Sequence, residues 1–434
     1  MKTNASPSAI ALLALACVSA CSAGKDDGGP GQPLDGGLGD ASGGTDTRRD
    51  DAVMLDTDPG FTIDGEIGTD AGDLERVSSL ALEQVWFITG SFGSSEMLVD
   101  FRVKPPLVTC GGVVGSTDGF EGTGVFTDPK TGDLLFYTDG RKVFNGKDNA
   151  LLDNGDLLNG DSSACEPALI TPLDDKGKFY IFTNDTNVGS PSGVWYSTID
   201  LTVGPHGTVL KKNQPVTKGN PGEALDIVPH KNGSDFWLLT YEGAASVRAY
   251  LVNASGVSAT PVVSSTGLTG SVKRAAINHT YDYDHLALAM NFGGTTGLIA
   301  TADIDRATGM VSGTKTRVTG DLGYHASFSE DGTKLYYVRG TEGWQGIAYQ
   351  YDLTAGVDTM LGGTGMAAAK LAPDGKVYWA ANAKGSMGVV AEPNKAGTAC
   401  GFVESGLSLK GCTVAFGVPN QTASYLQYLP EKPR

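Results

Sequence analysis

From about residue 85 onward, short apolar runs rich in Val, Ile, Tyr, Phe and Trp alternate with clusters of Gly, Asp, Asn and Pro. No long stretch repeats its apolar residues every 3.6 positions or so, as an amphipathic helix would, whereas short runs bounded by turn formers are typical of strands. Glycine supplies 61 of the 434 residues, about twice its average share, which fits a fold with many tight turns. The pattern predicts an all-β fold.

The predicted strands come in repeated pairs. In the two clearest copies, residues 326–337 and 369–379, an apolar strand enters an Asp-Gly turn and returns as an aromatic strand. Asp-Gly suits such a turn because glycine tolerates a positive φ and the Asp side chain bonds the nearby backbone. Four diverged copies span residues 125–137, 169–182, 227–239 and 276–289. The turns, 43 to 56 residues apart, fall at residues 132, 177, 233, about 283, 332 and 375. Such a period fits the four-stranded blades of a β-propeller.

Strands at the two ends of the domain lie outside these six copies. Two are predicted before the first copy, at 85–88 and 97–103, and two after the last, at 413–416 and 424–429. Either end alone would expose unpaired strand edges, which proteins avoid. We therefore expect the N- and C-terminal strands to share one blade and to close a seven-bladed β-propeller over residues 85–434, with eight blades as the alternative.

The N-terminus predicts export. Lys2 precedes the apolar run 9–16, which is too short to span a bilayer, and residues 18–21 read Val-Ser-Ala-Cys. This ending resembles the lipobox of bacterial lipoproteins, in which the cysteine is lipidated and becomes the mature N-terminus. The resemblance implies a signal peptide over residues 1–20 and lipidation of Cys21; an ordinary cleaved signal with an accidental cysteine is the alternative.

Residues 21–74 are predicted to form a disordered Gly/Asp-rich tether. Between residues 22 and 73 lie 13 acidic and three basic residues, −10 of the formal net charge of −17. Such a segment buries too little apolar surface to offset its ordering entropy. Its Asp-Gly pairs lack the register of a calcium loop. The remaining chain is mildly acidic, which argues against nucleic acid as a partner.

The Asp-Gly repeats resemble those of WD40-like propellers of the periplasmic TolB type. A further resemblance rests on residues 133–145, 168–170, 180–183, 195–197 and 417–420. These segments are similar to the N-terminal propeller of Bacteroidetes gliding-motility and type IX-secreted surface proteins. That resemblance implies a propeller fold and little about activity. The chain ends at Arg434 soon after the last predicted strand, so we expect lipidation to replace the sorting domain of that family.

Besides Cys21, four cysteines follow the signal peptide: Cys110, Cys165, Cys400 and Cys412. An even number in an exported protein predicts disulfides. Because Cys400 and Cys412 are close in sequence, we expect them to pair, which leaves Cys110 to pair with Cys165. A zinc site is the alternative, although no C-x₂-C pair is present.

The chain contains no H-E-x-x-H, P-loop or G-x-S-x-G motif. In a propeller, however, residues just before the first strand of each blade line one mouth of a central channel. Here they are Glu121, Glu166, Glu223, Lys273 or Arg274, His325 and Lys370. Two readings are open: a mutually paired polar ring, which we favour, or a site for a small ligand or a metal ion.

These patterns predict a lipid-anchored, non-enzymatic module that binds or scaffolds a protein or polymer of the cell envelope. We expect the anchor to be its only membrane contact, in the outer membrane and facing the periplasm or the cell surface. No cofactor is predicted. The alternative is a propeller enzyme (a lyase, hydrolase or quinone-dependent dehydrogenase) acting on an extracellular substrate.

Overall fold

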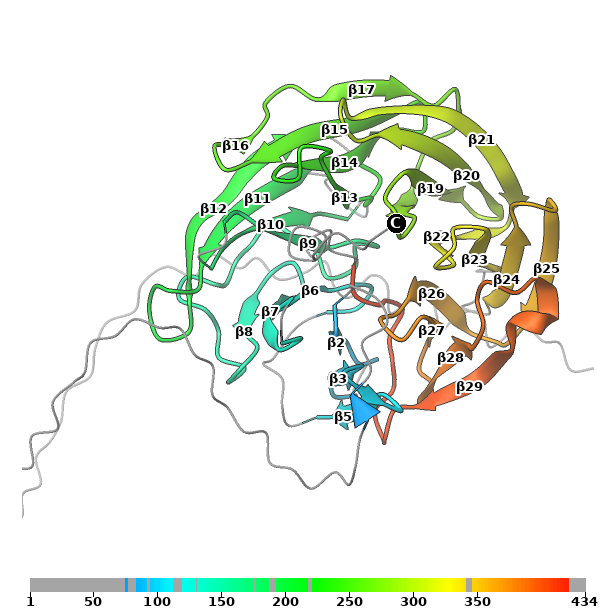
Figure 1. Ribbon diagram of the computed structural model, residues 1–434, viewed down its shortest axis with the longest axis horizontal. Coiled ribbons are helices and arrows are strands. Elements are labelled where there is room, and N and C mark those ends of the chain that lie inside the picture. The colour runs from blue at the N-terminus through cyan, green and yellow to red at the C-terminus, as the bar shows by residue number, and fades with distance from the viewer. Residues whose placement is uncertain are drawn as a thin grey trace, which may run out of the picture. The chain divides into compact units, whose positions relative to one another are not determined.

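Seven antiparallel sheets, each of three to five strands, are arranged around a common centre in the computed structural model (Figure 1). The structure describes residues 75–76, 83–91, 94–111, 119–129, 131–174, 177–186, 193–217, 221–340 and 346–420. The predicted signal peptide, Cys21, the tether and the strand at 424–429 lie outside these ranges. No helix among the described residues is long and apolar enough to cross a membrane.

Each sheet is one blade built from consecutive strands. Blade 1 contains β2 (Val85–Ile88), β3 (Met97–Asp100) and β5 (Leu107–Cys110), and blade 2 contains β6 (Gly124–Thr127), β7 (Leu134–Thr138) and β8 (Val143–Asn145). Blade 3 contains β9 (Ala168–Pro172), β10 (Lys178–Asn184), β11 (Val194–Asp200) and β12 (Thr208–Thr217). Blade 4 contains β13 (Asp226–Pro229), β14 (Phe236–Glu242), β15 (Ser246–Asn253), β16 (Gly256–Val257) and β17 (Val262–Ser265).

The remaining blades have four strands each. Blade 5 contains β18 (Arg274–His279), β19 (His285–Gly293), β20 (Thr296–Asp305) and β21 (Met310–Gly320). Blade 6 contains β22 (Leu322–Phe328), β23 (Lys334–Arg339), β24 (Ile347–Asp352) and β25 (Val357–Gly362). Blade 7 contains β26 (Met366–Leu371), β27 (Val377–Ala381), β28 (Ser386–Val390) and β29 (Phe402–Ser408). Outside the blades, β1 (Glu75–Arg76) pairs with β4 (Val103–Lys104), and η2 (Gly397–Cys400) is a 3-10 turn.

The six hairpins predicted from the sequence form the first two strands of blades 2 to 7. Each predicted turn residue has a positive φ; they are Gly132, Gly177, Gly233, Tyr283, Gly332 and Gly375. Glycine adopts this conformation without steric cost, which is why five of the six turns use it. The prediction of a seven-bladed propeller is confirmed.

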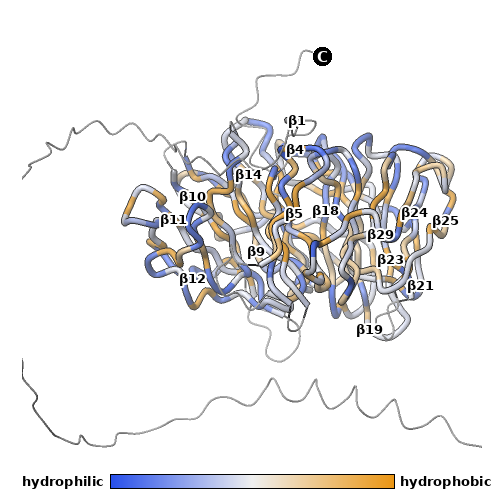
Figure 2. The backbone as a smooth tube through the Cα atoms, turned by 90° about the horizontal axis from the view of Figure 1, so that it is seen from below, coloured by the Kyte–Doolittle hydropathy of each residue, from blue (hydrophilic) through white to orange (hydrophobic). Residues whose placement is uncertain are grey.

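Apolar side chains fill the space between neighbouring blades. Seen edge-on, apolar and polar segments alternate along the strands (Figure 2). Between blades 7 and 1, the Tyr378 ring lies 6.0 Å from Trp86 and 5.4 Å from Phe101. Between blades 1 and 2, Phe87 lies 4.4 Å from Tyr137. Because each blade buries its faces against two neighbours, the ring is stabilised by its closure.

Both ends of the domain meet at blade 1. Beyond β2, Gly90 forms an antiparallel bridge with Val414. The Ser91 N–H donates to the Thr413 carbonyl (2.9 Å), and the Ala415 N–H donates to the Thr89 carbonyl (3.2 Å). Residues 413–416 thus close the ring as predicted, through a short bridge rather than a full strand, because the chain then turns toward the centre.

The predicted disulfide pairing is wrong. Cys110 is bonded to Cys412 with a Cα–Cα distance of 5.5 Å, across 302 residues of sequence. Cys165 and Cys400 are buried free thiols. Ring closure brings the end of β5 beside Cys412, whereas η2 carries Cys400 into the core of blades 6 and 7, next to Tyr336 and Trp379. Proximity in sequence was therefore a poor guide to proximity in space.

Candidate functional site

The first strands of the blades surround the centre of the ring, and six of the predicted site residues lie in or just before these strands in blades 2 to 7. All are buried except Arg274, which is half-buried. The structure divides them into two groups. Glu121 and Glu223 belong to the first group, together with Cys165, and Glu166 and Lys370 belong to the second.

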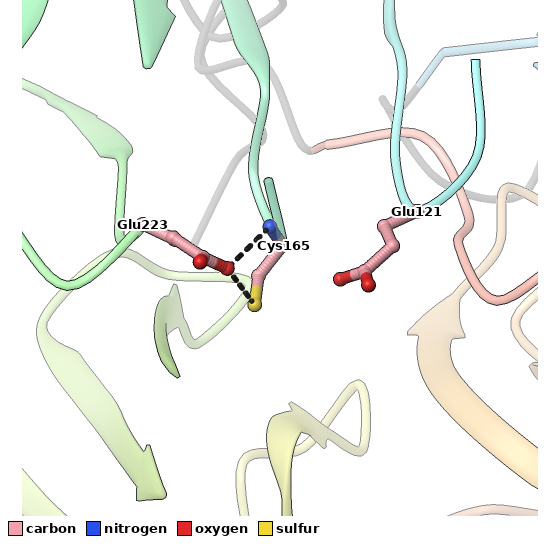
Figure 3. Close-up of side chains that lie close together, drawn as sticks. All are labelled: Glu121, Cys165 and Glu223. Atoms are coloured by element: carbon pink, nitrogen blue, oxygen red, sulfur yellow. Dashed lines mark hydrogen bonds between the residues drawn. The ribbon is translucent and has the colours of Figure 1, made fainter. Parts of the chain in front are cut away.

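Glu121, Cys165 and Glu223 form the first group, named here the Glu–Cys–Glu group (Figure 3). Each lies three residues before the first strand of its blade, in blades 2, 3 and 4 respectively. One ligand atom of each lies within 4.8 Å of those of the other two. The repeat thus places one side chain at the equivalent position, three residues before the first strand, in three successive blades.

Glu223 holds this group together. Its Oε2 accepts hydrogen bonds from the Cys165 N–H (3.2 Å) and from the Cys165 thiol (2.9 Å). Glu223 itself adopts a φ of 68°, which is unusual for a residue with a side chain. Such a conformation costs about 1 kcal/mol, and it persists where surrounding contacts determine it. The two bonds to Cys165 are contacts of that kind.

The charges around the Glu–Cys–Glu group keep the thiol protonated. Burial raises the pKa of Cys165 well above its usual value, and the carboxylates of Glu223 and Glu121 raise it further, against the opposing effect of Arg274. A protonated thiol is a weak nucleophile. Cys165 is therefore a hydrogen-bond donor at neutral pH rather than a candidate catalytic nucleophile.

His325 adjoins this group through the backbone of Cys165. Burial, followed by the charge of Lys370, lowers the pKa of His325 to about 4, and a hydrogen bond to the Cys165 backbone opposes this shift. The imidazole is therefore neutral at pH 7. Two carboxylates, a thiol and a neutral imidazole are all side chains that bind divalent cations. The Glu–Cys–Glu group is where this protein could hold a metal ion.

The second group is centred on Glu166. Its Oε2 accepts hydrogen bonds from the N–H groups of Leu225 (2.6 Å) and Ile277 (3.3 Å), which belong to blades 4 and 5. Burial, followed by the charge of Asp226, raises the pKa of Glu166, while the two amides and Lys370 oppose that rise. Glu166 thus links three blades.

Lys370 supplies the positive charge of this second group. Burial lowers its pKa to about 8, against the opposing charges of Glu83, Glu166 and Asp226. Nearby, the Nδ1 atom of His279 lies 3.0 Å from each carboxylate oxygen of Asp226. This group therefore gathers titratable residues from blades 1, 3, 4, 5 and 7.

Sequence reasoning missed four residues of these groups. Glu83 stands two residues before β2, as Glu166 does before β9, so the rule for the other blades would have found it. Cys165 was assigned to a disulfide. Asp226 and His279 lie within strands, and nothing in the sequence singles them out.

The positions of His325 and Lys370 also differ from the sequence-based expectation. Both lie inside the first strands of their blades, β22 and β26, rather than before them. The pairing register shifts between Leu322 and Ala326 and between Met366 and Ala369. These irregularities extend the strands ahead of the regular hairpins.

The fold is a seven-bladed β-propeller with a buried polar centre. No protein-family model matches this chain, and no curated protein is significantly similar to it in sequence. Solved structures do share its fold. A candidate 6-phosphogluconolactonase from Bacteroides uniformis aligns with 77% of this chain and 96% of its own, at 12% identity and a TM-score of 0.45.

Two further structures illustrate the same likeness. TolB from Acinetobacter baumannii aligns with 76% of this chain and 78% of its own, at 13% identity and a TM-score of 0.32. Regucalcin, a calcium-binding protein from Agrobacterium tumefaciens, aligns with 70% of this chain and 96% of its own, at 16% identity and a TM-score of 0.37. At such values the likeness carries no inference about function.

Proposed function

We propose that this protein is a lipid-anchored β-propeller of the bacterial outer membrane that binds an envelope protein and is not an enzyme. The observation that carries this proposal is the burial and hydrogen bonding of the central carboxylates. Glu121, Glu166 and Glu223 are at most 3% exposed. Glu166 and Glu223 also accept hydrogen bonds from backbone amides of neighbouring blades. Carboxylates used in this way stabilise the ring and are not presented to a substrate.

The rim of blades 6 and 7 supports a protein partner. Val357 and Met360 on β25 are 52% and 59% exposed, and Val403 on β29 is 55% exposed. These two outer strands contact each other and carry no Lys, Arg or Pro. The outer strands of blades 3 and 5 do contain such residues, which protect strand edges from pairing. A rim that exposes apolar side chains beside Asp358 and Glu404, and that lacks Lys, Arg and Pro, is suited to contact another protein.

We predict that this rim carries the contact. In crosslinking and pull-down from native membranes, the double variant Met360→Asp/Val403→Asp should lose most of the partner recovered with the wild type, because each change puts a charge into an apolar interface. The matched control is Leu210→Asp on β12, where a 52% exposed leucine lies in blade 3. Leu210→Asp should retain the partner.

Two outcomes would contradict this assignment. Equal recovery with the double variant and the wild type would exclude the rim. Loss of binding in Glu121→Gln/Glu223→Gln, with the rim variant unaffected, would favour a ligand site or an enzyme at the centre of the ring.

The proposed anchor makes a separate prediction. Since Cys21 is the residue that the lipobox assigns to acylation, Cys21→Ser should move the protein from the membrane fraction to the soluble fraction. Ser22 after Cys21 resembles the sequence of outer-membrane lipoproteins, so the wild type should fractionate with that membrane. Membrane fractionation measures the location of the protein, and mass spectrometry of the mature N-terminus measures the acylation of Cys21. An unmodified N-terminus at another residue would overturn the lipidation of Cys21.

A further inference from the structure

Residues 412–420, named here the closing segment, run from blade 1 to the centre of the ring (Figure 1). Cys412 is held by the disulfide to Cys110. At the other end, the Asn420 N–H donates to the Thr123 carbonyl (2.8 Å), and the Asn420 side-chain amide donates to the Ala168 carbonyl (2.9 Å). The closing segment is therefore fixed at Cys412 by the disulfide and at Asn420 by hydrogen bonds beside the central groups.

The closing segment lies directly against the backbone of Glu121. The Phe416 N–H donates to the Phe120 carbonyl (3.2 Å), and the rings of these two residues are 5.0 Å apart. A Cβ atom on Gly417 would lie 0.9 Å from the Glu121 carbonyl oxygen, so only glycine fits there. Beyond Glu121 lies Cys165, whose thiol belongs to the Glu–Cys–Glu group. The segment therefore packs on the chain that carries this group.

The two cysteines of the disulfide differ in exposure. Cys412 is 1% exposed, whereas Cys110 is only partly buried. Of the two half-cystines, Cys110 is therefore the more exposed to a thiolate from outside. Among the described cysteines this is the one disulfide, and it joins the first blade to the end of the last.

We propose that the Cys110–Cys412 bond is a redox latch that holds the closing segment over the Glu–Cys–Glu group. A protein dithiol attacks the Cys110 sulfur, forms a mixed disulfide and releases Cys412 as a thiolate, which takes up a proton. The second thiol of the reductant then displaces Cys110 as a thiol, so two electrons pass from the dithiol to the bond. The closing segment, now held by hydrogen bonds and by the packing of its apolar side chains without the covalent bond, opens locally while the strand pairs within the blades remain formed.

Cys165 and Cys400 provide the test, since both are buried free thiols. Cys165 belongs to the group beside the closing segment, whereas Cys400 lies in the core of blades 6 and 7. The full-length chain is alkylated at a fixed pH, before and after reduction by dithiothreitol, and each cysteine is quantified by mass spectrometry. The double variant Cys110→Ser/Cys412→Ser is treated in the same way. Reduction or the double substitution should accelerate alkylation of Cys165 by at least about tenfold and leave Cys400 unchanged.

A second variant tests, independently of redox chemistry, whether the closing segment protects Cys165. In Gly417→Ala the added methyl group cannot fit against Glu121, so Cys165 should react faster although the disulfide is intact. Unchanged alkylation of Cys165 in reduced wild type would overturn the latch. Equal acceleration of Cys165 and Cys400 would overturn it too, because it would show that the bond stabilises the whole ring rather than one segment.

Discussion

Deletion of residues 85–103 is expected to abolish the cooperative folding of the whole ring. The deletion removes β2 and β3, and with them the Trp86 contact with Tyr378 of blade 7 and the Phe87 contact with Tyr137 of blade 2. It also removes the pairing partner of residues 413–415. Blades 2 and 7 would each expose an apolar face and strand edges. Because every blade is stabilised by packing against its neighbours, this loss destabilises the whole ring and not blade 1 alone.

Circular dichroism and differential scanning calorimetry measure this result. We expect loss of the cooperative melting transition and of the near-ultraviolet signal from the buried aromatic residues. The matched control deletes residues 22–73, a longer stretch that lies outside the described residues, and should leave the transition unchanged. A cooperative melt at a similar temperature in the 85–103 deletion would show that closure at blade 1 does not stabilise the other blades.

The hairpins could be predicted from sequence because their signals are local. Asp331-Gly332 and Asp374-Gly375 each place a turn former between two apolar runs, and the backbone conformation of a turn depends mainly on its own residues. The diverged copy at Tyr283 is the weakest of the six, because its two apolar runs are visible in the sequence but a tyrosine at positive φ has no recognisable signature. Blade 1 was inferred from the two unpaired ends.

The contacts between distant segments could not be predicted in the same way. Cys110 and Cys412 are brought together by closure of the ring, and their distance in sequence gives no hint of it. The candidate site was predicted in part, because Glu121, Glu166 and Glu223 repeat at the starts of blades. Whether such residues pair, and with which partners, depends on the position of each side chain along the central axis of the ring. Glu223 contacts Cys165, whereas Glu166 contacts the amides of the next two blades.

Substitution of Lys370 by Met is expected to lower the free energy of unfolding by about 3 kcal/mol at pH 7, as loss of one partner in a buried ionic group does. Lys370 is 5% exposed and faces the acids Glu83, Glu166 and Asp226. Without it these buried acids lose their counter-charge, and the pKa of Glu166, already raised in the wild type, rises further.

The pH dependence follows from that shift. An acid whose pKa is higher in the folded state than in the unfolded state stabilises the fold at low pH, and this contribution is lost as the pH rises through the folded pKa. The deficit of Lys370→Met relative to the wild type should therefore be small near pH 5 and grow toward pH 7. Urea titrations at a series of pH values measure it.

Glu166→Gln provides the matched test of this explanation. The glutamine retains an oxygen for the amides of Leu225 and Ile277 but removes the charge, so it should restore much of the stability lost in Lys370→Met, and the double-mutant cycle should be strongly non-additive. If the two changes were additive, with the Lys370→Met deficit independent of pH, the loss would come from packing of the lysine side chain. Lys370 and Glu166 would then contribute to the stability of the ring independently of each other's charge.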